Sequence, residues 1–286
     1  MSVRVGNIEI GHGQPLFVIA GPCVIESWDV IYATACELKK LSEQLGFSLV
    51  FKASFDKANR TSYDSFRGPG LEFGLEMLAE IKRKLGVPVL SDVHETEQCA
   101  KAGDVLDIVQ IPAFLCRQTD LVVAAARTMK AVNIKKGQFV APLDILHSVK
   151  KVTAEGNTNV FVTERGTTFG YNNLVVDMRS FPIIQDEGVP LIFDATHSVQ
   201  LPSAAGGVSG GQRQYIPTLT RAAIAAGCQG LFMEVHPNPD EAKSDAATQI
   251  PLGLTKDFLA QCVALYNQVS QLKEIRMPEK GHCVAV

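Results

Sequence analysis

The strongest constraint on the fold is an alternation of short apolar runs with longer amphipathic segments that continues along almost the whole chain. The runs are rich in Val, Ile, Leu and Phe, which is typical of strands buried on both faces of a parallel sheet. The predicted strands cover residues 16–21, 49–53, 87–92, 107–111, 132–135, 159–163, 189–194 and 230–235. The predicted helices cover residues 28–45, 71–85, 119–131, 145–154, 217–226 and 255–272.

Eight predicted strands that alternate with amphipathic segments within 286 residues favour a closed barrel over an open sheet. An open doubly wound sheet would show a glycine-rich turn after its first strand, and none stands there. The pattern therefore predicts the α/β class and a single (β/α)8 TIM barrel domain over residues 1–286. Residues 1–14 are expected to form an N-terminal β-hairpin that caps the barrel, because Gly6-Asn7 is a turn signal, and 273–286 a C-terminal tail.

Charge and composition exclude several classes of partner. The net charge of −3 gives no general basic field, so no nucleic-acid partner is expected. No window approaches the roughly 18 uninterrupted apolar residues of a membrane span, so no membrane partner is expected either. The first ten residues do not resemble a secretory signal, and seven cysteines without regular spacing suit a reducing compartment. A cytoplasmic location is expected.

Cationic side chains follow several of the predicted strands. In a (β/α)8 barrel the carboxyl ends of the strands meet at one rim, where the active site forms. Together these cations could neutralise two phosphates, or a phosphate and a carboxylate. Any one of them alone is equally compatible with a solvated loop residue. They are Lys52, Lys57, Arg60, Arg117, Lys135, Lys136 and Arg165.

A second group of residues has the chemistry of metal ligands. Cys23 follows the first strand, His197 the seventh, Glu234 lies near the end of the eighth, and Asp245 lies in the next loop. Closure of the barrel would make the first and eighth strands neighbours and bring the four together. A mixed sulfur, nitrogen and oxygen set suits Zn²⁺, Fe²⁺ or Mn²⁺. Taken singly, Cys23 fits a small apolar filler better than a ligand, and His197 is also compatible with a hydrogen-bonded core histidine.

Other polar residues at the same rim have several possible roles. Each could orient a sugar hydroxyl, relay a proton or cap a helix. They are Asp92, His94, Gln110 and Asp194. The glycine-rich residues 205–213 are compatible with a mobile lid or a passive loop, and His282-Cys283 with a metal pair or a frayed tail.

Several motifs resemble the 3-deoxy-D-manno-octulosonate 8-phosphate synthase family over nearly the whole chain. They are residues 19–23 with Glu26-Ser27, 51–61, 91–94, 110–119, 163–166 with 169–173, 194–198, and 234–237 with Ser244-Asp245. The resemblance implies condensation of phosphoenolpyruvate with D-arabinose 5-phosphate and water, giving 3-deoxy-D-manno-octulosonate 8-phosphate and inorganic phosphate for lipopolysaccharide (Kdo) biosynthesis. The related heptulosonate synthases use erythrose 4-phosphate, and the motif Lys57-Ala58-Asn59-Arg60 favours the octulosonate enzymes.

The resemblance also implies roles for individual residues. Phosphoenolpyruvate would be held by Lys52, Ser54, Lys57, Gln110, Lys135 and Arg165, with the choice of Lys135 over Lys136 open. Arabinose 5-phosphate would be held by Asn59, Arg60, Thr61 and Arg117, and Asp92 and His94 would also bind substrate. Residues expected to act in the reaction are Lys52, Lys57, Cys23, His197 and Asp245. Cys23, which is Asn in the metal-independent branch, places the sequence with the metal-dependent enzymes.

Two positions depart from the family pattern, and one non-enzymatic alternative stays open. Leu143 stands where Trp is common and Thr61 where Ser is usual, which affects helix packing and fine substrate contacts. The resemblance implies a homotetramer. The alternative is a non-catalytic barrel that binds sugar phosphates and shows ligand-induced stabilisation without turnover.

Overall fold

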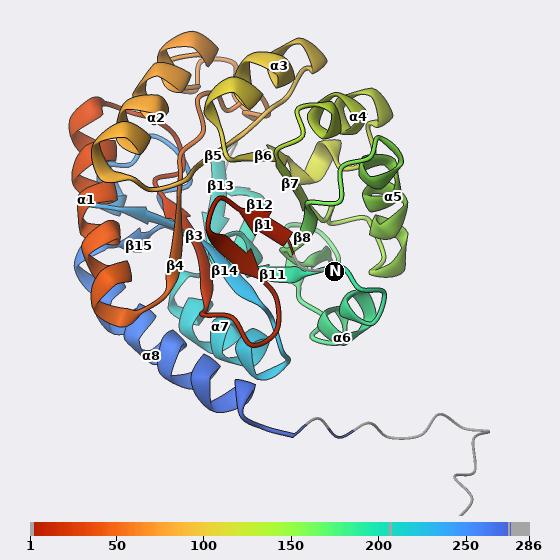
Figure 1. Cartoon of the computed structure of the whole chain (residues 1–286). Coiled ribbons are helices and arrows are strands. Elements are labelled where there is room, and N and C mark those ends of the chain that lie inside the picture. The colour runs from red at the N-terminus through yellow and green to blue at the C-terminus, as the bar shows by residue number, and fades with distance from the viewer. Residues whose placement is uncertain (1–2, 206–207, 274, 276–286) are drawn as a thin grey trace, which may run out of the picture.

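Eight parallel strands form the barrel that the apolar runs predict (Figure 1). The computed structural model describes residues 3–205, 208–273 and 275. β14 pairs with both β11 and β3, so the sheet closes on itself. Each strand lies within two residues of its predicted bounds. The strands are β3 (Phe17–Gly21), β4 (Ser48–Lys52), β5 (Val89–Asp92), β6 (Ile108–Ile111), β7 (Ala131–Lys135), β8 (Val160–Glu164), β11 (Leu191–Asp194) and β14 (Gly230–His236).

Helices surround the barrel, and six of them follow the predicted amphipathic segments (Figure 1). These six are α1 (Trp28–Leu45), α2 (Leu71–Leu85), α4 (Thr119–Arg127), α5 (Leu146–Ala154), α7 (Ile216–Ala225) and α8 (Leu252–Ser270). The predicted helix 119–131 was too long, because residue 131 already belongs to β7. Sequence analysis missed α3 (Thr96–Val105), whose buried face has only small side chains, and the six-residue α6 (Ser180–Gln185).

Local signals explain why α1 begins and ends where it does. The Ser27 hydroxyl accepts a hydrogen bond from the Val30 N–H at 3.3 Å, which satisfies one of the free donors of the first turn. Gly46 takes the left-handed conformation at the other end and donates its N–H to the Ser42 carbonyl. A glycine is favoured at such a position because a Cβ would be strained there.

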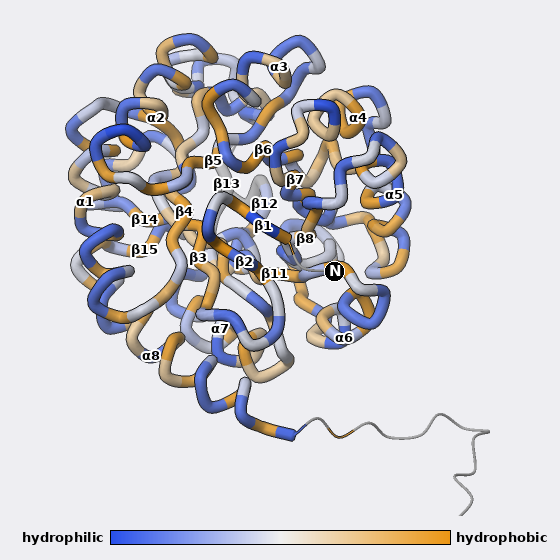
Figure 2. Tube along the Cα trace, in the orientation of Figure 1, coloured by the Kyte–Doolittle hydropathy of each residue, from blue (hydrophilic) through white to orange (hydrophobic). Residues whose placement is uncertain are grey.

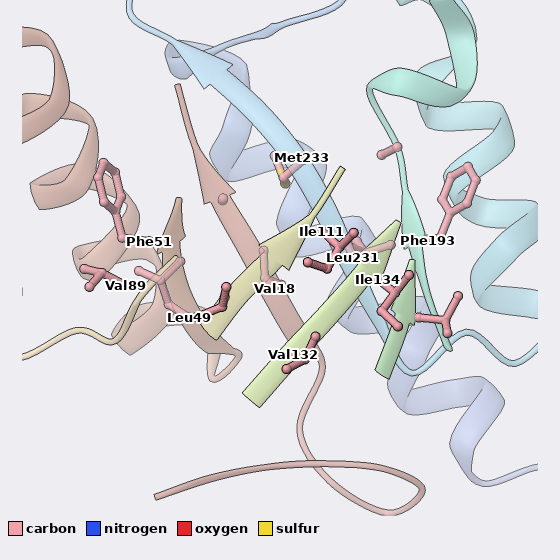
Figure 3. Packing of buried hydrophobic residues seen from close by; sticks show 14 of the residues in the cluster. Val18, Leu49, Phe51, Val89, Ile111, Val132, Ile134, Phe193, Leu231 and Met233 are labelled. Carbon is pink, nitrogen blue, oxygen red and sulfur yellow. The ribbon is translucent and has the colours of Figure 1, made fainter. Parts of the chain in front are cut away.

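The core has two layers that follow from the alternation of side chains along each strand. Residues facing outward, among them Val18, Leu49 and Leu231, pack against the helices (Figure 3). Residues facing inward, such as Phe17 and Phe161, fill the barrel itself. Figure 2 shows hydrophobic colour along barrel strands such as β3 and β4, and hydrophobic and hydrophilic stretches that alternate along the surrounding helices.

The predicted N-terminal hairpin is confirmed, and it closes the lower end of the barrel. β1 (Val3–Val5) pairs antiparallel with β2 (Ile8–Ile10) around a left-handed Gly6. Val3, Val5 and Ile10 belong to the same apolar cluster as the inward-facing strand residues. Figure 1 shows the hairpin lying across the barrel axis. The opposite rim is therefore the open end of the barrel.

Short elements in the connecting loops surround that opposite rim. Of residues 205–213, left open as a lid or a passive loop, residues 205 and 208–211 belong to the antiparallel pair β12 and β13, and residues 206–207 lie outside the described residues. His282-Cys283 lies outside the described residues. Among the described helices, none combines the length and apolar composition needed to cross a bilayer. The short elements are β9 (Thr167–Thr168), β10 (Leu174–Val175), β12 (Gln200–Ala205), β13 (Val208–Gly211), β15 (Ile250–Pro251), η1 (Ala113–Leu115), η2 (Leu143–Ile145), η3 (His197–Val199), η4 (Arg213–Tyr215) and η5 (Pro239–Glu241).

The closure of the barrel depends on a close approach at Gly230, the first residue of β14. A Cβ built there would lie 2.6 Å from the Phe17 carbonyl oxygen and 3.0 Å from Ile192 Cγ2. We therefore expect Gly230→Ala to destabilise the protein by about 1–3 kcal/mol, the usual cost of overpacking. The matched control is Gly253→Ala on α8, where a Cβ meets nothing within 4 Å. Thermal unfolding should show a lower melting temperature for the first variant only, and equal temperatures would contradict the expected clash.

Candidate functional site

A cavity of about 430 Å³ opens at the rim where the barrel strands end. Most of the predicted site residues line it, and they come from seven of the eight strand ends. The hairpin end of the barrel is filled by apolar side chains, so the polar groups are confined to this rim. The predicted residues that line the cavity are Lys52, Lys57, Asn59, Arg60, Thr61, Asp92, His94, Gln110, Lys135, Arg165, His197, Glu234 and Asp245.

Lys52 is the last residue of β4 and is almost fully buried. Its Nζ lies 2.7 Å from Glu234 Oε1 and 2.8 Å from the Cys23 carbonyl oxygen. An uncompensated ammonium would be costly at this depth, and Glu234 removes that cost. The ion pair ties the end of β4 to β14 and to the segment that follows β3.

Lys135 reaches the cavity from the end of β7. Its Nζ lies 2.6 Å from Asp194 Oδ2 and 3.5 Å from the centre of the Phe232 ring. Burial lowers the pKa of Lys135, although Asp194 opposes the shift. Lys136, the other candidate, is fully buried, and its ammonium donates to the Val140 carbonyl at 3.1 Å. Among the described residues Lys135 lines the cavity and Lys136 does not, so the geometry favours Lys135.

Arg165 follows β8 and offers an unused donor. Its Nη2 donates to the His197 carbonyl and to Gln200 Oε1, at 3.3 and 2.5 Å. Its Nη1 is buried without a hydrogen-bond partner among the described residues. Gln110 has its amide oxygen occupied by Asn133 at 3.0 Å, which leaves the NH₂ group as the donor toward the cavity. Both groups suit an anionic ligand.

The four predicted metal ligands converge as barrel closure requires. Ligand atoms of Cys23, Glu234 and Asp245 all lie within 4.8 Å of one another. His197 Nε2 lies 3.5 Å from Glu234 Oε2 and 3.5 Å from Asp245 Oδ2. Glu234 Oε2 is buried and has no hydrogen-bond partner among the described residues, so this oxygen is available to bind a cation. Such a set fits a divalent metal ion.

Asp194 holds the His197 ring in place within this set. Its Oδ1 accepts the His197 backbone N–H at 2.9 Å, and its Oδ2 lies 2.8 Å from Nδ1 of the ring. Burial would raise the pKa of the Asp194 carboxyl, but His197 and Lys135 outweigh it and keep the pKa low. Because Nδ1 faces this carboxylate, Nε2 is the nitrogen directed at Glu234 and Asp245.

The loop that carries Asp245 is held by residues that sequence analysis did not single out. Asp245 has a positive φ of 49°, an uncommon conformation for a residue other than glycine. Gln249 is fully buried, accepts the Cys23 N–H at 3.2 Å and donates to the Ser244 carbonyl at 2.8 Å. Nothing in the sequence marked Gln249, because its burial and its contacts arise only when the loop folds. Gln138 and Gln200 also line the cavity and were missed.

The residues predicted for the sugar phosphate lie at the cavity mouth. Asn59 and Thr61 are exposed, and Arg60 donates from Nη1 to Ser244 Oγ at 2.7 Å. Deeper in the cavity, Asp92 Oδ1 accepts a hydrogen bond from Ser54 Oγ at 2.5 Å. The other carboxylate oxygen, Asp92 Oδ2, lies 3.0 Å from His94 Nε2. Ser54 itself is fully buried behind Asp92.

Ser54 does not line this cavity, and neither does Arg117. Arg117 lines a separate hollow together with Phe139, His147 and Lys151. Leu143, one of the two departures from the family pattern, is 54% exposed at the start of η2. It therefore affects the surface of the protein and not the cavity. Thr61, the other departure, does line the cavity.

Comparisons with known proteins agree with this geometry. The family model described as the DAHP synthetase I family matches residues 1–271. A protein from Trichlorobacter lovleyi named 2-dehydro-3-deoxyphosphooctonate aldolase is 56% identical over 92% of this chain and 97% of its own length. A protein with the same name from Geobacter sp. (strain M21) is 58% identical over 87% of this chain and 92% of its own length. Another from Francisella tularensis subsp. holarctica is 52% identical over 90% of this chain and 94% of its own length. The chain therefore belongs to the DAHP synthetase I family.

Proposed function

We propose that this protein condenses phosphoenolpyruvate with D-arabinose 5-phosphate and water to give 3-deoxy-D-manno-octulosonate 8-phosphate and inorganic phosphate. The names of relatives that are 52–58% identical over most of the chain support this reaction. The structural observation that supports it most strongly is the group of cations around one rim cavity, Lys52, Lys57, Lys135 and Arg165. Phosphoenolpyruvate carries a phosphate and a carboxylate, which such a group can neutralise.

The two substrates are proposed to occupy different depths of the cavity. Phosphoenolpyruvate would bind among Lys52, Lys57, Gln110, Lys135 and Arg165, with Ser54 acting through Asp92. Arabinose 5-phosphate would bind nearer the mouth, at Asn59, Arg60, Thr61 and His94. Two anions held close together repel each other unless cations compensate them. Positioning and electrostatic stabilisation by the rim would then supply much of the rate enhancement.

The proposed chemistry forms one carbon–carbon bond and one carbon–oxygen bond, the latter from water, and breaks the carbon–oxygen bond to phosphate. C3 of phosphoenolpyruvate attacks the aldehyde carbon of the open-chain sugar, and the aldehyde oxygen takes up a proton. Water adds at C2 and loses a proton. The C2–O bond to the phosphate then breaks, which releases inorganic phosphate and leaves the keto acid. Among this chain's residues, Lys52, Lys57, His197 and Asp245 lie where they could move protons or stabilise charge during these steps.

We also propose that Cys23, His197, Glu234 and Asp245 hold a divalent ion, Zn²⁺, Fe²⁺ or Mn²⁺, as in a metal-dependent enzyme. When bound, such an ion supplies positive charge that orients a carbonyl oxygen or lowers the pKa of a water. The unpaired Oε2 of Glu234 and the contact of His197 Nδ1 with Asp194, which directs Nε2 toward the other ligands, support this assignment.

The setting of the enzyme is proposed on the same resemblance. We expect a cytoplasmic homotetramer that supplies lipopolysaccharide (Kdo) biosynthesis. Arg117 is kept in the proposed substrate set with one condition. Because it does not line the cavity of its own chain, its contact with arabinose 5-phosphate would have to be made in the cavity of a second copy.

The reaction is tested by measuring inorganic phosphate released from phosphoenolpyruvate. We expect release to require arabinose 5-phosphate, to stop after chelation and to return with added divalent metal. Release with erythrose 4-phosphate alone would assign the heptulosonate reaction instead. Thermal stabilisation by either sugar phosphate without any phosphate release would indicate a binding protein and not an enzyme.

Replacing Lys135 tests its role in binding phosphoenolpyruvate. Lys135→Met removes a buried, charge-assisted contact worth about 1.5–3 kcal/mol, so kcat/KM should fall roughly ten- to a hundredfold. The control is Lys150→Met, which removes an exposed lysine of α5 and should leave the kinetics unchanged. Equal kinetics for both variants would remove Lys135 from the site.

Replacing Cys23 tests the metal site without relying on activity. Cys23→Ala removes the only sulfur ligand of the set, so the purified variant should contain much less divalent metal than the wild type. Cys99→Ala, which removes another buried thiol away from the cavity, should retain the metal. Atomic emission of metal-reconstituted protein gives the stoichiometry, and an unchanged content in Cys23→Ala would refute the proposed ligand set.

A further inference from the structure

Two buried, oppositely charged residues behind the cavity have no part in the proposed reaction. Lys136 directly follows β7, and Glu164 is the last residue of the neighbouring β8. Both side chains are 1% exposed, and Lys136 Nζ lies 3.5 Å from Glu164 Oε1. A buried charge without compensation is strongly unfavourable, so each of these residues depends on the other.

The pair connects the loops that follow the two strands. Lys136 Nζ donates to the Val140 carbonyl in the loop after β7, at 3.1 Å, and to Thr167 Oγ1 after β8, at 3.4 Å. Glu164 Oε1 accepts the N–H of Gly166 at 2.6 Å. Gly166 has a φ of 94°, a conformation that favours glycine. The ion pair thus fixes the first residues of both loops.

The residues adjacent to this pair along the chain are cations of the cavity. Lys135 precedes Lys136 and Arg165 follows Glu164, and both line the cavity. Successive side chains of a strand point to opposite sides, so adjacent residues can face the cavity and the ion pair in turn. The ion pair and the two cavity cations therefore share the same stretches of backbone. The Lys136 N–H also donates to the Thr163 carbonyl at 2.9 Å, which fixes the register of the two strand ends. A shift of either loop would therefore move Lys135 or Arg165.

We propose that the Lys136–Glu164 ion pair is a positioning element that holds Lys135 and Arg165 at the separation required by phosphoenolpyruvate. This inference rests on the proposed function, in which those two cations bind that substrate. Among the described residues that line the cavity, neither Lys136 nor Glu164 is found. Their effect acts through the backbone of the two strand ends.

The direction in which each variant changes phosphoenolpyruvate affinity distinguishes positioning by the ion pair from the effect of its electrostatic field alone. If only the field mattered, Glu164→Gln would remove a negative charge near Arg165 and tighten the binding of an anion, whereas Lys136→Met would weaken it. If positioning matters, both variants weaken binding, because each breaks the connection between the loops. Misplacement of binding groups by about 1 Å costs up to a hundredfold in rate.

The experiment measures steady-state kinetics for both substrates, and phosphoenolpyruvate binding by calorimetry, in Lys136→Met and Glu164→Gln. We expect each variant to raise KM and Kd for phosphoenolpyruvate about tenfold and to change KM for arabinose 5-phosphate much less. Glu164→Asp, which keeps the charge, should recover most of the affinity. The control is Val152→Ala, a buried residue of α5 away from the cavity, which should lower the melting temperature and leave both KM values unchanged.

Several outcomes would overturn the inference. Unchanged phosphoenolpyruvate affinity in both single variants would overturn it. An affinity that rises in one variant and falls in the other would also overturn it. If a single variant fails to fold, the double variant Lys136→Met/Glu164→Gln leaves no unpaired buried charge and provides the test. It should also raise KM for phosphoenolpyruvate, and wild-type affinity in it would reject positioning. Failure of the proposed function is distinguishable, because the wild type would then release no phosphate.

Discussion

The pairing of β14 with β3 is the constraint on which the rest of the structure depends. It closes the barrel in a register that places Glu234 opposite Gly21. That single contact brings the end of the chain's last barrel strand beside its first, so Cys23 meets Asp245 across 222 positions of sequence. The hairpin then fills the lower end with apolar side chains. Only the upper rim is left for polar chemistry, as is general for barrels of this kind.

Buried charge at that rim is organised in pairs, and the pairing explains why so many cations can share one cavity. Lys52 is balanced by Glu234 and Lys135 by Asp194. In each case the carboxylate also faces His197, so the cation positions and the candidate metal ligands are parts of one network. Loss of one member would leave a partner charged and buried, which is the costly case. The site is thus held together by the same charges that suit it to bind anions.

Much of this arrangement could be predicted from sequence, and the failures have physical reasons. The eight strands and six long helices followed from apolar periodicity. The helix α3 was missed because its buried face consists of Cys99, Ala102 and Gly103, which give a weak apolar signal. The helix α6 has too few residues to show a period. Gln249 was missed because a glutamine signals nothing by itself, and its contacts with Cys23 and the Ser244 carbonyl exist only in the folded loop.

The sequence alone determined the fold class and the residue types available at the rim. Periodicity is a local property, and in a (β/α)8 barrel every strand end is directed to the same face, so position relative to a strand is enough to collect candidates. Only the tertiary structure decided which candidates meet. It directed Lys135 into the cavity and Lys136 away from it, and it placed Arg117 beside a different hollow. Those choices depend on strand register, side-chain direction and the pairing of buried charges, which are set by contacts between segments far apart in the chain.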